Sequence, residues 1–134
     1  MEKFINIDRI TINRILLYKN YFEDSSNIFY KTYIASNGLS SFHYSNEVLQ
    51  FQKDLKEHKF LLNVDFVRIS NKSQFAKYIK YPNLITNASF ETLRKLLTYH
   101  ICREEWCEGH LANMIDRRQI VKILFRLKDF ANKG

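Results

Sequence analysis

The chain has 134 residues, of which 46% are hydrophobic and 15% aromatic, which allows a packed core and argues against an intrinsically disordered chain. This length predicts one domain, residues 1–134. The formal net charge of +7 and the pI of about 9.4 favour acidic partners such as nucleic acid, a ribonucleoprotein or an acidic protein surface, although ordinary solubility accounts for the same charge equally well.

Two cysteines are too few for a disulfide framework, which predicts a reducing compartment. Residues 1–5 lack the apolar core of a signal peptide. No run of residues approaches the roughly 18 apolar residues that a membrane-spanning helix needs. We therefore expect a cytoplasmic protein without a membrane segment.

The first half of the chain predicts two helices and two strands. Asp8 is a suitable N-cap for the first helix, whose apolar residues recur at near-helical spacing. A loop over residues 36–41 follows the first strand and leads to Ser45, the N-cap of the second helix. Because two strands are marginal in water, they must pack on helices. The expected elements are helix 8–22, a polar turn at 23–27, strand 28–34, helix 46–58 and strand 60–67.

The second half of the chain predicts four helices. The first of them ends near Tyr81, because Pro82 biases its predecessor away from helix. Ser89 caps the clearest helix of the chain, which carries one apolar stripe. The elements together predict an α+β fold, a helix-dominated single domain with a small two-stranded sheet. The expected helices are 73–79, 90–103, 110–115 and 117–130, the last with Ile120, Ile123, Leu124 and Leu127 facing inward.

Residues 104–112 hold the only tryptophan, one of two cysteines, one of four histidines and one of three glycines. If the segment is helical, Cys107 and His110 share a face, as a thiolate nucleophile and its base would. In the structural alternative, Gly109 ends one helix and begins the next, and His110 makes an internal hydrogen bond. We favour this packed elbow. Its residues are Trp106, Cys107, Gly109, His110 and Leu111.

Two further kinds of site overlap this segment. A zinc site would use His100, Cys102, Cys107 and His110, but two residues that are two positions apart in a helix point to different sides. An acid–base or metal-binding pair would use two of the carboxylates of Glu104, Glu105 and Glu108, which more often balance local charge. We predict no catalytic residue, no metal and no cofactor.

Cations recur on one side of the last predicted helix. Arg118, Lys122 and Arg126 follow each other every four residues, opposite the apolar stripe, and this spacing suits a row of phosphates or an acidic partner. Around residues 77–81, lysines alternate with tyrosines, whose rings can stack on exposed bases. Either region can equally be a solvated face. The predicted nucleic-acid or partner-binding residues are Arg117, Arg118, Lys122, Arg126, Lys77, Tyr78, Lys80 and Tyr81.

Three stretches resemble a family of small bacterial and mobile-element proteins of unknown function. They are L-R-K-L-L-T at 93–98, the aromatic-Cys-Glu-Gly-His-Leu-Ala motif at 106–112, and I-x-x-I-L-x-x-L at 120–127. The similarity is good over residues 89–130 and weaker over 44–66, and the first 40 residues do not match clearly. The resemblance implies no activity, because the family has none assigned.

Small proteins of this composition are often carried by phages and mobile elements, where one role is the inhibition of host defence. With the two basic regions, we expect a non-enzymatic binding protein for nucleic acid or a ribonucleoprotein. More narrowly, it would be a phage-type anti-CRISPR inhibitor that occludes an RNA-guided nuclease. The expected partner is RNA or such a nuclease complex, with no membrane and no small-molecule substrate. The alternatives are an enzyme or metal site at Cys107 and His110, and a host protein-interaction module.

Overall fold

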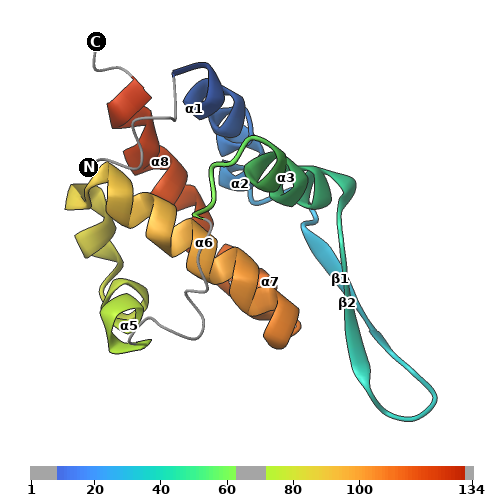
Figure 1. Ribbon diagram of the computed structural model, residues 1–134. Helices are drawn as coiled ribbons and strands as arrows, with labels where there is room; N and C mark the ends of the chain where they lie inside the picture. The colour runs from blue at the N-terminus through green and yellow to red at the C-terminus, as the bar shows by residue number, and fades with distance from the viewer. Residues whose placement is uncertain (1–8, 63–71, 132–134) are drawn as a thin grey trace.

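The molecule consists of a body of helices from which one β-hairpin projects (Figure 1). The structure, a computed structural model, describes residues 9–62 and 72–131. Its helices and strands confirm the predicted helix-dominated α+β fold with a two-stranded sheet. In chain order they are α1 (Arg9–Leu16), α2 (Lys19–Glu23), β1 (Tyr30–Ile34), β2 (Ser40–Tyr44), α3 (Asn46–Glu57), α5 (Lys72–Lys80), the 3-10 helix η2 (Pro82–Asn87), α6 (Phe90–Trp106), α7 (His110–Asp116) and α8 (Gln119–Ala131).

Helix α8 organises the core. It packs against α1, α2, α6, α7 and η2, and Figure 1 shows it between α1 and α6. Its predicted apolar stripe is confirmed, because all four side chains are fully buried: Ile120, Ile123, Leu124 and Leu127. Burying an aliphatic side chain of this size contributes about 1.5–3 kcal/mol, so this stripe is a main source of stability.

Two serines begin the helices that they were predicted to cap. The hydroxyl oxygen of Ser45 accepts the amide of Val48 at 3.2 Å, and that of Ser89 accepts the amide of Thr92 at 3.1 Å. Each bond satisfies a backbone donor that has no partner within its helix. The starts of α3 and α6 are therefore set by local sequence.

The predicted helix over residues 8–22 is two helices in the structure. Between α1 and α2 the chain turns Tyr18 toward α3. There its hydroxyl donates to the Asp54 carboxylate, and its ring packs edge-on against Phe51 with centroids 5.2 Å apart. The break is thus stabilised by contacts with a distant helix. The predicted N-cap, Asp8, lies outside the described residues.

The partner of β1 is β2, whereas the sequence predicted residues 60–67. The chain reverses in a tight turn, in which the Ala35 amide donates to the Leu39 carbonyl at 2.8 Å and Gly38 takes a φ of 86°, which favours glycine. The strands pair antiparallel, with Tyr30 opposite Tyr44 and Ile34 opposite Ser40. The loop predicted at 36–41 therefore ends earlier, and β2 begins within it.

Residues 60–62 are not a strand, and residues 63–67 lie outside the described part of the chain. Phe60 is fully buried, and its carbonyl accepts a hydrogen bond at 2.8 Å from Nε of Arg94. Apolar character at this position therefore reflects packing on α6. A side chain, not a neighbouring strand, satisfies the backbone there.

Two helix boundaries near the elbow differ from the prediction. Helix α6 continues three residues beyond 103, to Trp106. Helix α8 begins at Gln119, because Arg118 has a φ of 65° that an α-helix does not accommodate. Arg117 and Arg118 consequently lie in the turn between α7 and α8.

Candidate nucleic-acid interface

The turn between α6 and α7 contains the cysteine-glutamate-glycine-histidine motif. Gly109 has a φ of 97° and precedes α7, so the prediction that it ends one helix and begins the next is confirmed. Leu111 is buried, also as predicted. Trp106 is 71% exposed and Cys107 is exposed, so their predicted packing within the elbow is wrong. Because α6 extends to Trp106, its last turn lies beyond the core.

His110 turns inward and meets His100 of α6. Nδ1 of His100 and Nε2 of His110 form a hydrogen bond of 3.0 Å. Burial lowers the pKa of His100 to about 3, with the neighbouring His110 adding to the shift. Burial, and next the charge of Arg103, lowers the pKa of His110 to about 4. Both imidazoles are neutral at pH 7, so the pair acts as the predicted internal hydrogen bond.

The Cys107 thiol does not share this site. Within residues 9–62 and 72–131, no hydrogen bond joins it to His110, and the imidazole instead faces His100. The same part of the chain holds no group of three or more histidine, cysteine, aspartate or glutamate side chains that could bind a metal ion. The motif therefore offers neither an assembled nucleophile–base pair nor an assembled metal centre among the described residues.

The elbow instead holds the base of the hairpin. The carboxylate of Glu108 accepts the Phe42 amide of β2 at 2.7 Å. The hydroxyl of Tyr44, also on β2, accepts the Ala112 amide of α7 at 3.1 Å. Gly109 lies so close to the Phe42 ring that any side chain at this position would displace the ring. The motif therefore has the structural role that was predicted for it. It anchors the arm, as we call the hairpin formed by β1 and β2, to the helices.

The other two carboxylates of the motif are also engaged. Glu104 accepts the amides of Gly109 at 3.2 Å and Leu111 at 2.8 Å, and thereby caps α7. Glu105 forms an ion pair of 3.4 Å with Lys56 of α3. Local charge balance and capping account for these acids.

The arginines of the predicted basic row bind backbone carbonyls. The guanidinium of Arg118 donates to the carbonyls of Phe22 at 3.2 Å and Glu23 at 3.4 Å, which ties α2 to the start of α8. Nε of Arg126 donates to the Ala88 carbonyl at 2.9 Å, where η2 leads into α6. Arg117 bonds the Asn113 side chain at 3.2 Å. These cations are therefore not a continuous free row.

The second predicted region, at the end of α5, is more open. Lys77 and Lys80 are exposed, and their ammonium groups lie 5.3 Å and 5.5 Å from the ring centroids of Tyr78 and Tyr81. Tyr81 is 55% exposed. Tyr78 packs against the core, and its carbonyl accepts the Gln119 side chain at 3.2 Å. Tyr81 can receive a stacked base, whereas Tyr78 cannot do so freely.

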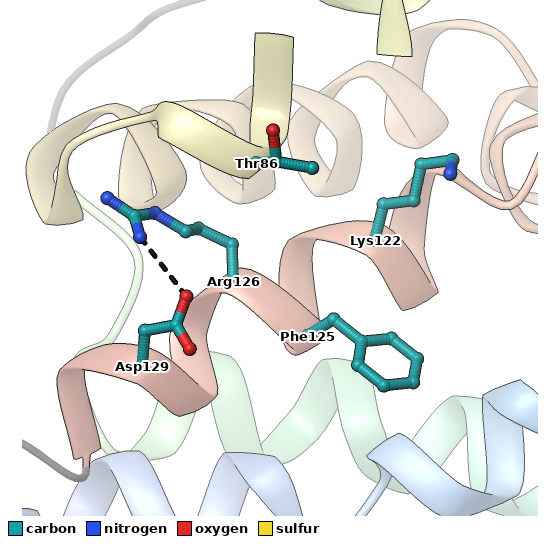
Figure 2. Close-up of a pocket in the computed structure, with 5 residues that line it drawn as sticks. All are labelled: Thr86, Lys122, Phe125, Arg126 and Asp129. Carbon is teal, nitrogen blue, oxygen red and sulfur yellow. Dashed lines mark hydrogen bonds and ion pairs between the residues drawn. The ribbon is translucent and has the colours of Figure 1, made fainter. Parts of the chain in front are cut away.

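The two basic regions lie on helices that both adjoin η2. This short helix follows Tyr81 directly and packs against both α5 and α8. Between η2 and α8 lies a cavity of about 280 Å³, which we call the η2–α8 pocket (Figure 2). In this view Thr86 hangs from η2 between Lys122 and Arg126 of α8. The pocket is lined by Thr86, Lys122, Phe125, Arg126 and Asp129.

Sequence reasoning had found Lys122 and Arg126 but not the rest of the pocket. Phe125 is 42% exposed and lies off the buried stripe of α8, so an aromatic residue on the polar side of that helix was the available signal. Thr86 and Asp129 had no comparable signal, because their place beside the lysine depends on how η2 packs on α8.

The family comparison matches nearly the whole chain. A family described as "Family of unknown function (DUF6508)" matches residues 9–133. The chain belongs to the DUF6508 family. No curated protein and no solved structure matches it. The DUF6508 match agrees with the resemblance to a family of unknown function, but it also covers residues 9–40, which the resemblance had left without a clear match. It brings no activity with it. Within the described ranges, the DUF6508 chain has no helix that is both long enough and apolar enough to cross a membrane.

Proposed function

We propose that this DUF6508 protein is a non-enzymatic binding protein that holds RNA, free or within a ribonucleoprotein, on the face formed by α5, η2 and the adjoining side of α8. The observation that carries the proposal is that lysines stand on two helices, α5 and α8, that both pack against the same short helix, η2. Lys77 and Lys80 come from α5, and Lys122 comes from α8. We call these three residues the η2 lysines.

The ammonium groups of the η2 lysines are available to bind an anionic ligand. Within the described ranges, no hydrogen bond or ion pair occupies their ammonium groups, whereas Arg118 and Arg126 already bind backbone carbonyls. A phosphate can therefore replace water around the lysines without breaking a hydrogen bond or an ion pair of the fold. Lysine binds phosphate as a point charge and does not require a fixed planar geometry.

The chain on both sides of Lys77 and Lys80 is free of acidic residues. From residue 66 to residue 90 the sequence contains no aspartate or glutamate. A segment with one sign of charge produces a positive potential that attracts a polyanion and speeds its association. The exposed ring of Tyr81 lies at the junction of α5 and η2 and adds a surface on which a base can stack.

Binding of a fluorescent single-stranded RNA by anisotropy, over a series of salt concentrations, tests the proposal. Three phosphate contacts predict a slope of about −2 in a plot of log K against log salt. The double variant Lys77→Glu/Lys80→Glu should weaken binding and make this slope shallower. Lys31→Glu/Lys53→Glu is the matched control, because it lowers the net charge by the same amount and both lysines are exposed, on β1 and α3, elements that lie far from α5 in Figure 1. Equal loss in the control and in Lys77→Glu/Lys80→Glu, or no binding at low salt, would contradict the proposal.

A narrower form of the proposal is inhibition of an RNA-guided nuclease. The η2 lysines would cover phosphates of the guide RNA and block access of the target. The support is the high positive charge of a small chain and the unoccupied lysines. A nuclease loaded with guide RNA should cleave its target more slowly as the protein is added, and Lys77→Glu/Lys80→Glu should restore cleavage. Unchanged cleavage at saturating protein would refute this form while leaving RNA binding intact.

A further inference from the structure

We propose that the η2–α8 pocket is a binding site for one unpaired nucleotide, with the base against Phe125 and the phosphate on Lys122. The inference rests on the proposed RNA binding and adds to it a preference for single strands over duplex. The inference is about the pocket, whereas the η2 lysines on α5, Lys77 and Lys80, lie on an open face. The two can therefore be tested separately.

The size of the pocket fits a ligand of this class. Its volume of about 280 Å³ lies just below the range for small-molecule sites, roughly 300–1,000 Å³. A site of that size takes a single nucleotide, whereas a folded RNA element or a peptide chain would have to remain outside. Because η2 packs against α5 as well as against α8, the strand that continues from the bound nucleotide over η2 would reach Lys77 and Lys80.

The chemistry of the lining distinguishes a nucleotide from a simple anion. Lys122 supplies a cation that, within the described ranges, has no hydrogen bond or ion pair. Arg126 adds a second cation, of which Nε and Nη1 are engaged with the Ala88 carbonyl and with Asp129 at 3.1 Å. Phe125 adds a flat apolar surface. A phosphate alone would use the cations and leave the ring without a role, whereas a nucleotide carries both an anion and a ring that stacks.

Phe125 is held in place before any ligand arrives. The ammonium group of Lys19 lies 4.4 Å from the centre of its ring, and the same ammonium pairs with Glu23 at 3.4 Å. A cation over one face of an aromatic ring attracts it electrostatically and limits its motion. A ring that is already oriented loses little conformational entropy when a base stacks on it.

A base inside a duplex cannot reach this pocket. It would have to leave its stack and its pair, which costs a few kcal/mol, whereas an unpaired base pays much less. The pocket therefore predicts tighter binding of a single strand than of a duplex with the same number of phosphates. The lysines of the open face contact phosphates only and would show no such preference, whereas a base stacked on Tyr81 would. Only the part of the preference that Phe125→Leu removes therefore belongs to the pocket.

The first experiment compares a labelled RNA octamer as a single strand and as a blunt duplex, by anisotropy. We expect the single strand to bind at least about tenfold tighter, and Phe125→Leu to weaken single-strand binding about tenfold while duplex binding stays unchanged. Tyr33→Leu on the hairpin is the matched control, because Tyr33 is an aromatic residue that is 50% exposed. Equal binding of both forms, with no effect of Phe125→Leu, would overturn the nucleotide site and leave RNA binding standing. No binding of either form would refute the proposed function itself.

A second measurement probes the pocket directly. Adenosine monophosphate, added to isotope-labelled protein, should shift the amide signals of η2 and of the middle of α8 in nuclear magnetic resonance spectra. Lys122→Gln should reduce these shifts. Inorganic phosphate at the same concentration should produce smaller shifts, because it makes no contact with Phe125. Equal shifts from phosphate and the nucleotide would show an anion site without base recognition and would overturn the inference.

Discussion

Replacing Gly109 by alanine puts a methyl group at the joint between the elbow and the hairpin. Gly109 has a φ of 97°, and an L-residue pays about 1–2 kcal/mol to adopt that region. The new Cβ would lie 2.6 Å from Cε1 and 2.7 Å from Cζ of Phe42, so the ring must move. Overpacking typically costs about 1–3 kcal/mol. The free energy of unfolding should therefore fall by about 2–5 kcal/mol in total.

Gly38 provides a matched control for the backbone part of this cost. It has a φ of 86°, but nothing lies within 4 Å of where its Cβ would be. Gly38→Ala should therefore lose about 1–2 kcal/mol, from strain alone. Urea denaturation followed by circular dichroism gives both values. If Gly109→Ala costs no more than Gly38→Ala, the contact with Phe42 does not hold the arm. If the contact with Phe42 does hold the arm, adding Phe42→Ala to the Gly109→Ala variant should restore part of the lost free energy of unfolding.

Three more predictions concern single contacts. Ser89→Ala removes the cap of α6 and should lower the free energy of unfolding by about 1 kcal/mol in urea denaturation. Glu108→Ala removes the acceptor of the Phe42 amide, whose hydrogen exchange should become about fivefold faster while amides of α8 keep their rates. His100 and His110 have pKa values of about 3 and about 4 in the fold, whereas the unfolded chain binds these protons near pH 6.5. Stability should therefore be fully present above pH 6.5 and fall, by up to about 2.7 kcal/mol per pH unit, between pH 6 and pH 4.5. His110→Gln should make that fall shallower. An unchanged pH profile in this variant would refute the conclusion that the two buried histidines cause the loss of stability.

The sequence predicted the features that depend on near neighbours. Ser45 and Ser89 cap their helices because a serine and the amide three residues later belong to one turn of chain. The stripe of α8 is readable because helical periodicity alone decides which residues share a face. The turn at Gly109 was also predictable, because a positive φ depends on the residue itself and glycine adopts it freely.

The hairpin shows where local reasoning failed. Its turn carries the pair Asn37 and Gly38, a recognised hairpin signal that was interpreted as a loop. The strand after it begins with two serines, which do not favour β-structure. What stabilises that strand is the elbow, through Phe42 and Tyr44, and those contacts join residues 66 and 68 positions apart. Such a contact leaves no periodicity in the sequence.

In the candidate site, the rarity of tryptophan and the regular spacing of the cations led to wrong predictions. Trp106 is the only tryptophan, but its place at the end of α6 leaves it in solvent. The four-residue spacing of the cations on α8 correctly placed Lys122 and Arg126 together, yet it did not reveal which cations the fold would use. Arg118 and Arg126 donate to backbone carbonyls that come from other elements. Which charges remain for a ligand is therefore decided by tertiary packing.

Arg126 belongs to both the fold and the proposed pocket, and this determines how the pocket can be studied. Its bond to the Ala88 carbonyl ties the end of η2 to α8. Removing a charged donor of this kind costs about 1.5–3 kcal/mol, so lost binding in an Arg126 variant would not separate a missing phosphate contact from a displaced η2. Lys122 has no such bond within the described ranges. A ligand that binds only the folded protein stabilises it by RT ln(1 + [L]/Kd), so a nucleotide between η2 and α8 must also raise the Tm. Lys122→Gln should reduce that rise without lowering the Tm of the free protein, and this is how binding at the pocket is distinguished from support of the fold.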